Sequence, residues 1–188
     1  IVRTLLRNFL IAMIIAIAII LFKSSIADLT AYFFSTSIET QELIKTYIFV
    51  RVLSVPAEFI IYILVGFYLA IQKTNISSLL VITMSAFNIV LSSFFVLSMS
   101  LNVFGVVLGT LIASYITAVI FSLYTYRFII NKFQIIPTFQ RLIIPSKFLR
   151  LFIINFDLFV RTLVLTFSFL WISYLGSKLG EYYLATNP

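Results

Sequence analysis

The sequence predicts an all-α membrane protein whose chain crosses the bilayer five times. Hydrophobic residues make up 62% of the 188 residues and charged residues 10%, which leaves too few polar side chains to cover the surface of a soluble domain. Five apolar stretches are each long enough to cross a hydrocarbon core, which takes about 20 helical residues. Polar residues do not alternate with the period of two that a membrane β-barrel requires.

The five stretches define the predicted helices in order. Thr36 and Glu39 have the spacing of a capping box, which predicts the start of the second helix because both side chains can bond free amides there. This helix is expected to run to Gln72, with its membrane-embedded part near 46–71. The other predicted spans cover 5–27, 78–99, 105–127 and 150–175.

The basic residues between these stretches predict the orientation. Thirteen basic residues against six acidic ones give a net charge of +7, and in a membrane protein this excess belongs to cytoplasmic connections rather than to a nucleic-acid surface. Asp28, Glu39 and Glu42 gather on the opposite side. The chain is therefore expected to start in the cytoplasm and to leave residue 176 outside. Arg3 and Arg7 are expected to precede the first helix and Lys73 to follow the second. The region between the fourth and fifth helices holds Arg127, Lys132, Arg141, Lys147 and Arg150.

Cysteine and histidine are both absent. This excludes disulfides, thiolate chemistry and Ser-His-Asp hydrolysis, and it removes the commonest metal ligand. We expect no enzyme activity, no cofactor and no metal. Because the chain starts at Ile1 and stops soon after a helix, we interpret it as a piece of a longer protein.

The segment 128–149, with Pro137 and Pro145, is the one long mixed connection. It predicts a division into four linked helices over 1–127, a cytoplasmic loop over 128–149, and a further helix over 150–188. A linker between two helix bundles and a plain cytoplasmic loop both fit its composition.

Polar and small residues form two patterns on the third and fourth predicted helices. Polar side chains share one face of the third helix and must meet protein or water, either as packing contacts or as the lining of a cavity. Small residues repeat every four positions on the fourth helix and predict close packing, beside a polar edge that includes Thr110. The first set is Ser78, Ser85, Asn88 and Ser92, the second is Gly105, Gly109, Ala113 and Thr117, and Ser114 and Thr117 complete the edge.

The second predicted helix carries Arg51, Pro56 and Glu58. Proline removes one amide donor, so Pro56 is expected to bend the helix. Arg51 is expected to extend to the outer interface. Glu58 lies deeper, one turn from Tyr62, where a carboxylate pairs, titrates or faces water.

Asp157 and Arg161 lie near the start of the fifth predicted helix, roughly 9 Å and 15 Å from its entrance at 1.5 Å per residue. Four residues apart, with the acid first, they share one face and are expected to form an ion pair. Such a pair is either an internal support between helices or part of a substrate or proton pathway.

Three ordered blocks, 47–72, 88–115 and 155–187, are similar to a multidrug and toxic compound extrusion (MATE) transporter of the DinF-like branch. The residues that carry the resemblance are Arg51, Pro56, Gly66, Gln72, Asn88, Gly105, Gly109, Thr110, Asn155, Asp157, Arg161, Gly180, Ala185 and Asn187. The resemblance implies twelve helices in two lobes, of which this chain holds helices three to seven, with 128–149 as the loop between lobes. The other helices, and the acid that the family uses in its first helix, lie outside this chain.

The resemblance implies a secondary antiporter in a bacterial-type inner membrane. It would export organic, cationic or amphipathic compounds in exchange for H⁺ or Na⁺ by alternating access. Asn88 and Thr110 match polar cavity positions of the family and, together with Ser92, are expected to line the transport cavity. Many relatives have aspartate where this chain has Ser92, and a hydroxyl carries no charge at neutral pH. Glu58 is a candidate substitute. A lipid-linked saccharide flippase and a truncated remnant without transport are the alternatives.

Overall fold

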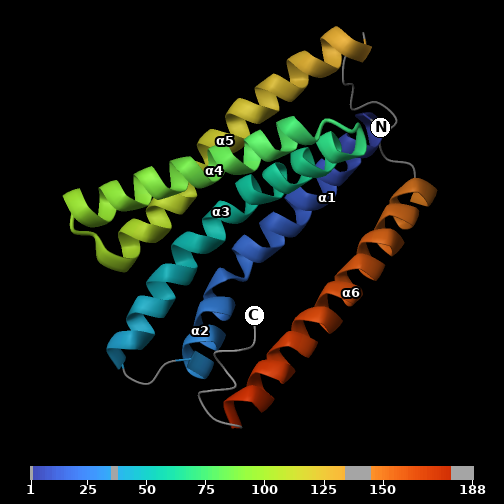
Figure 1. Ribbon diagram of the computed structural model, residues 1–188. Coiled ribbons are helices and arrows are strands. Elements are labelled where there is room, and N and C mark those ends of the chain that lie inside the picture. Colours follow the sequence, from blue (N-terminus) through green and yellow to red (C-terminus); the bar gives the residue numbers. More distant parts are fainter. Residues whose placement is uncertain (1, 35–37, 134–144, 179–188) are drawn as a thin grey trace. The chain divides into compact units, whose positions relative to one another are not determined.

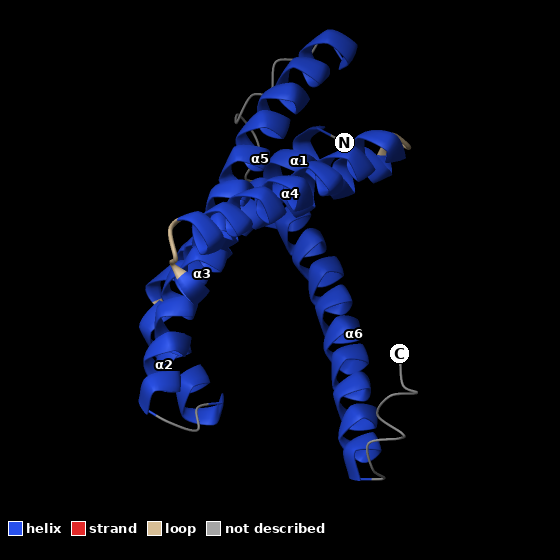
Figure 2. Cartoon of the chain, turned by 60° about the vertical axis from the view of Figure 1, so that its left-hand side comes forward, coloured by secondary structure: helices blue, strands red, loops and turns tan. Residues whose placement is uncertain are grey.

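The computed structural model describes residues 2–34, 38–133 and 145–178, and the regular structure in these ranges is entirely helical (Figures 1 and 2). Five segments are long and apolar enough to cross a membrane. The predicted fold class, an all-α polytopic membrane protein, is therefore confirmed. The elements are α1 (Val2–Leu21), α2 (Lys23–Phe34), α3 (Ile38–Ala70), α4 (Thr74–Ser93), the π-helical turn η1 (Phe94–Ser98), α5 (Asn102–Phe133) and α6 (Pro145–Lys178).

The helix bounds differ from the predicted ones at three places. The first span is interrupted at Phe22, between α1 and α2. Helix α5 continues past residue 127 to Phe133 and α6 begins at Pro145, so helices occupy both ends of the predicted 128–149 connection. The apolar-length criterion finds only the part of a helix that fits the hydrocarbon, whereas backbone hydrogen bonds continue into the polar region. The predicted capping box involves Thr36 and the side chain of Glu39, and both lie outside the part of the chain that the structure describes.

The chain divides into two compact units, residues 1–142 and 143–188. In the first unit α3 is central and packs against α1, α2, α4 and α5, while α4 and α5 form a long hairpin (Figure 1). The second unit contains α6, whose 34 residues make a rod of about 51 Å. The assignment of these units to two transporter lobes stays a prediction.

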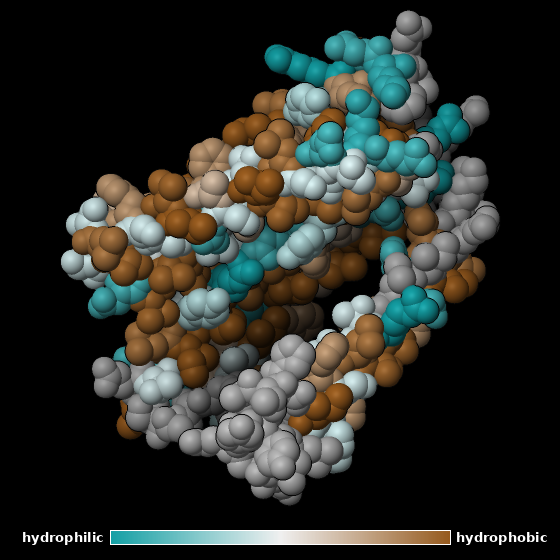
Figure 3. Space-filling view, in the orientation of Figure 1, coloured by the Kyte–Doolittle hydropathy of each residue, from teal (hydrophilic) through white to brown (hydrophobic). Residues whose placement is uncertain are grey.

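The core of the first unit is narrow and lies where α3, α4 and α5 meet. One cluster of buried side chains joins the middle of these helices, and a second lies near the end of α3. In the second, Tyr68 is fully buried and its hydroxyl lies 2.8 Å from Thr125 Oγ1. Many large apolar side chains are exposed on these helices, and broad hydrophobic areas are visible on the face shown in Figure 3, as expected for helices that face lipid. The first cluster is Ala57, Ile61, Leu64, Leu80, Ala118 and Phe121.

Some of the charged residues lie at the two ends of the first unit. Lys73 and Lys132 both lie over the ring of Phe128, with Nζ 5.4 Å and 5.8 Å from its centroid. At the other end Lys45 Nζ lies 2.7 Å from Asp28 Oδ1. Arg7 corrects a prediction, because it lies inside α1 with a buried side chain rather than before the first helix. The helix starts earlier than its most apolar part, which brings Arg7 into the packed unit.

Candidate functional site

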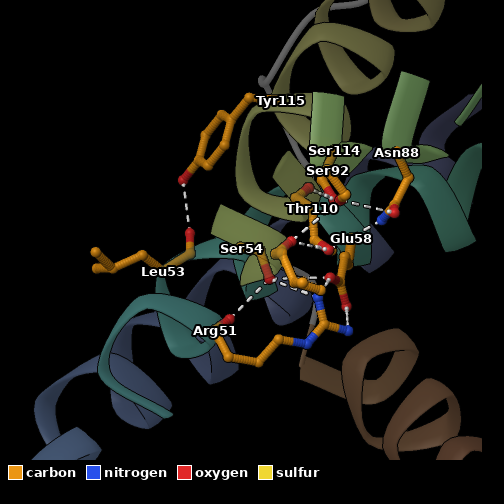
Figure 4. Close-up of polar contacts among 10 residues, drawn as sticks. Arg51, Leu53, Ser54, Glu58, Asn88, Ser92, Thr110, Ser114 and Tyr115 are labelled. Carbon is orange, nitrogen blue, oxygen red and sulfur yellow. Dashed lines mark hydrogen bonds and ion pairs between the residues drawn. The ribbon is translucent and has the colours of Figure 1, made fainter. Parts of the chain in front are cut away.

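Three of the residues predicted to line a cavity meet between α4 and α5 (Figure 4). Asn88 Nδ2 on α4 donates a hydrogen bond of 2.9 Å to Thr110 Oγ1 on α5. Ser92 lies one turn after Asn88, and its hydroxyl is 3.3 Å from Asn88 Oδ1. The side chains of Asn88, Ser92 and Thr110 are each partly exposed. The structure thus joins residues that are 22 positions apart in the chain into one polar cluster, here called the α4–α5 network.

Backbone carbonyl groups of α5 complete the α4–α5 network. The carbonyl of Val106 accepts from Thr110 Oγ1 at 3.0 Å and lies 3.2 Å from Ser92 Oγ. Because a serine hydroxyl has one proton, Ser92 donates either to Val106 or to Asn88 at a given moment. Ser114, which is buried, donates to the carbonyl of Thr110 at 2.8 Å.

The predicted stripes are only partly realised. Ser78 and Ser85 are exposed, and no hydrogen bond between described residues links them to Asn88. On α5, Thr117 is fully buried, and its Oγ1 has no hydrogen-bond partner within the described part of the chain. The polar cluster is therefore confined to one level of the hairpin and does not follow either helix.

Small residues bring α4 and α5 close together at this level. A Cβ atom at Gly109 would lie 2.6 Å from the backbone nitrogen of Ser92 and 2.7 Å from its Cα. At Gly105 the nearest atoms would be 3.1 Å away, on Leu101 and Phe95. All four members of the predicted small-residue ridge are buried, which confirms its packing role. The contact at Gly109 holds Ser92 beside Val106 and Thr110.

A second polar cluster lies on α3 and consists of Arg51, Ser54 and Glu58. The guanidinium group forms a two-pronged ion pair with the carboxylate: Nη1 contacts Oε1, and Nη2 lies 3.2 Å from Oε2. Ser54 Oγ is buried beneath the pair, 3.1 Å from Arg51 Nη1 and 2.9 Å from Glu58 Oε1. The prediction that Arg51 extends to the interface is wrong for this structure, because the carboxylate two turns further along α3 holds it.

Pro56 lies inside α3, between the two charged residues. Its ring nitrogen has no proton, so the carbonyl of Val52 lacks its usual helical partner. One residue further, the carbonyl of Leu53 accepts a hydrogen bond of 3.1 Å from Tyr115 on α5. Helix α3 continues through the proline to Ala70, and the expected bend stays a prediction.

The Tyr115 contact places the two polar clusters at neighbouring levels of the first unit (Figure 4). Leu53 lies between Arg51 and Ser54 in the chain, and Tyr115 follows Ser114. Tyr115 is five residues, or about 8 Å of helix rise, from Thr110. Glu58 lies five residues beyond Leu53 on α3, and its hydrogen bonds among the described residues go to Arg51 and Ser54 rather than to the α4–α5 network.

On α6, Asp157 and Arg161 are both exposed within their unit. No ion pair or hydrogen bond between described residues joins them. A spacing of four residues puts two side chains on one face, but their contact also requires rotamers that neighbouring groups hold in place. The role of this pair stays a prediction.

Sequence reasoning missed Ser54 and Tyr115, which connect the site. Ser54 has a readable signal, because positions 51, 54 and 58 lie on one helical face at spacings of three and four. Tyr115 has none, because its partner is a main-chain carbonyl on another helix. Within the described residues no group of three or more acidic, cysteine or histidine side chains is placed to hold a metal ion.

Comparison with known proteins gives one relevant match. The chain is similar to the DNA damage-inducible protein F of Escherichia coli (strain K12), with 31% identity over 185 residues. The aligned region is 98% of this chain and 40% of that protein, so the chain spans about two fifths of the relative's length. No family model matches the chain, and no solved structure matches it either.

Proposed function

We propose that this chain is part of a MATE transporter of the DinF-like branch, which exports organic cations or amphipathic compounds in exchange for H⁺ or Na⁺. Two independent findings support the proposal. The similarity to the E. coli protein extends over nearly the whole chain, and the five apolar helices have the lengths that such a transporter requires. The remaining helices of the twelve would then be supplied by parts of the protein beyond this chain.

The α4–α5 network is the observation that carries the proposal. Its side chains belong to helices that cross the membrane, yet they stay partly exposed when the helices of the first unit have packed. Polar groups at this position must meet protein or water rather than lipid. Asn88 uses only one of its two N–H donors on Thr110, so it retains a donor for a bound compound.

Alternating access is the mechanism that this arrangement supports. In such transporters two lobes rock around a central binding site, and ligand or ion binding shifts the population between states. In the proposal α1 to α5 belong to the first lobe and α6 begins the second. The two polar clusters would face the central cavity. No covalent chemistry is involved, and the protein would act in the inner (plasma) membrane of a bacterial cell.

The decisive test is dye efflux from membrane vesicles that contain the full-length protein. Efflux that stops when the proton gradient is collapsed, but continues without a sodium gradient, identifies H⁺ as the coupling ion. The reverse result identifies Na⁺. Vesicles that release no dye faster than vesicles lacking the protein would contradict the proposed transport function.

Substitutions in the α4–α5 network are expected to lower export. Asn88→Ala removes the N–H donor proposed for the bound compound, and Thr110→Val removes the hydroxyl that orients Asn88. Loss of one hydrogen bond to the compound, about 1 kcal/mol, corresponds to roughly fivefold in its binding constant. Ser85→Ala, an exposed position on the same helix, is the matched control. The measurement is the initial efflux rate at equal amounts of protein in the membrane. Equal rates for all three variants would mean that the network only holds the helices together.

Asp157→Asn in the full-length protein is expected to reduce export while the amount of protein in the membrane stays near normal. The change keeps the shape of the side chain but removes its charge, so it tests a pathway role rather than packing. Ser168→Ala is the control, since Ser168 is exposed on the same helix and its hydroxyl donates to the backbone carbonyl of Val164, one turn earlier on α6. Unchanged export by Asp157→Asn would assign Asp157 and Arg161 to scaffolding.

A further inference from the structure

The Arg51–Glu58 ion pair connects no two helices, although both residues lie within a membrane-crossing segment. Its members are seven positions apart on α3, and their bridging residue Ser54 is on α3 too. The side-chain hydrogen bonds that join described helices near this pair are uncharged, namely Tyr115 to Leu53 and Asn88 to Thr110. Both charges lose hydration when they pair within the protein, and this pair links no two helices in return. It is therefore expected to contribute little to the stability of the fold.

The pair is also accessible from outside the first unit. The Arg51 side chain is 36% exposed and the Glu58 side chain is 14% exposed, whereas Ser54 beneath them is buried. The carboxylate is therefore partly accessible to a molecule that approaches α3 from outside the first unit. Among the described acidic residues of the first unit, Asp28 is on α2 and Glu42 is in the first turns of α3, so Glu58 is the one placed in the middle of a crossing helix.

We propose that Glu58 is a binding site for the positively charged group of an organic cation, and that Arg51 is the internal cation that occupies this site when it is empty. A substrate cation would displace the guanidinium group and take its place on the carboxylate. This inference rests on the proposed transport function and deepens it, because it assigns the charge recognition to a particular residue pair.

Arg51 has a second position available once it is displaced. Side chains of a helix lean toward its N-terminal end, which for α3 is the end predicted to lie at the outer membrane surface. A long arginine side chain can reach the polar interface from within the membrane. Release from Glu58 would therefore return Arg51 to the interface position that the sequence by itself suggests, without leaving its charge in lipid.

The bond pattern around Pro56 favours such an exchange. The ion pair reaches across the proline, with Arg51 on one side and Glu58 on the other. At this place α3 lacks one main-chain hydrogen bond. Replacing the pair by a contact between Glu58 and a ligand would remove a link between the two halves of α3, so binding would be coupled to the shape of this helix.

The test is equilibrium binding of tetraphenylphosphonium to the purified full-length protein, with tetraphenylborate as a probe of similar shape and opposite charge. Glu58→Gln is expected to weaken tetraphenylphosphonium binding by about tenfold or more, the loss expected for one charge-assisted contact. Arg51→Gln is expected to strengthen it severalfold, because the competing cation is gone. Binding of tetraphenylborate is expected not to weaken in Glu58→Gln.

The opposite signs separate exchange from a structural role. If Arg51→Gln weakens tetraphenylphosphonium binding as Glu58→Gln does, the pair is one structural unit and the proposal is wrong. Where Glu58→Gln does not accumulate in the membrane, the sign of the Arg51→Gln effect decides alone. A wild-type protein that exports the cation, together with variants that bind it equally well, would overturn the exchange and leave the transport function standing. A wild-type protein that neither binds nor exports any dye would overturn both.

Discussion

Gly109→Ala is expected to separate α4 from α5 and to cause a severe loss of stability. The new methyl group would lie 2.5 Å from Ser92 Oγ, and also 2.6 Å and 2.7 Å from the backbone nitrogen and Cα of Ser92. A hydroxyl can rotate away, but backbone atoms of a helix cannot move unless the whole helix shifts. Overpacking of this kind costs about 1–3 kcal/mol, and we expect the upper end of this range.

The measurement is the thermal unfolding midpoint of the full-length protein in detergent, together with its amount in the membrane. Gly66→Ala is the matched control, because outside the neighbouring backbone of α3 no atom lies within 4 Å of the added Cβ, and alanine favours a helix over glycine by about 1 kcal/mol. Gly105→Ala, with nearest atoms at 3.1 Å, is expected to lie between the two. Equal midpoints for Gly109→Ala and Gly66→Ala would show that the close contact is absent from the assembled protein.

Tyr68→Ala is expected to destabilise the first unit by about 3 kcal/mol or more, the range found when large buried aromatic side chains are removed. Tyr68 is fully buried between α3 and α5, and its ring packs edge-on against Phe67 with centroids 5.3 Å apart. The small side chain would leave a cavity and would also deprive Thr125 of its hydroxyl partner.

Tyr68→Phe separates the two contributions. It keeps the ring and removes only the hydroxyl, and Thr125 Oγ1 still donates to the carbonyl of Phe121 at 2.6 Å. The expected loss is therefore about 1 kcal/mol. Tyr62→Ala on the same helix, where the side chain is 64% exposed, is the control for losing a tyrosine from α3. The same unfolding measurement applies, and a Tyr68→Ala midpoint no lower than that of Tyr62→Ala would contradict the assigned core.

Predictions that depend on one helix at a time agree well with the structure. The five crossing segments follow from the length of apolar sequence, and the buried ridge of α5 follows from small residues at every fourth position. Helix ends agree less well, because Arg127 and Lys132 are as compatible with a helix above the membrane as with a loop. Arg7 shows the same limit at the start of α1. A charged residue at that place in the sequence suggests a position outside the membrane span, but its side chain is buried.

The sequence predicts which residues of the candidate site are polar and membrane-embedded, but not which of them contact one another. Asn88, Ser92 and Thr110 were each expected to avoid lipid, because a polar group on an apolar helix has few other options. Their joining into one cluster needed a structure, since α4 and α5 can slide or rotate against each other without changing either pattern. Gly109 selects the alignment by admitting the backbone of Ser92 at one level.

The sequence by itself determined that this protein is a set of membrane-crossing helices, because hydrophobicity and helical period are properties of each segment alone. Only the tertiary structure decided which of their polar positions meet. It brought Asn88 to Thr110 and Tyr115 to Leu53, and it showed Arg51 on Glu58 rather than at the membrane surface. The physical reason is that a side-chain contact depends on rotation, register and rotamer, which only the packing of neighbouring groups selects.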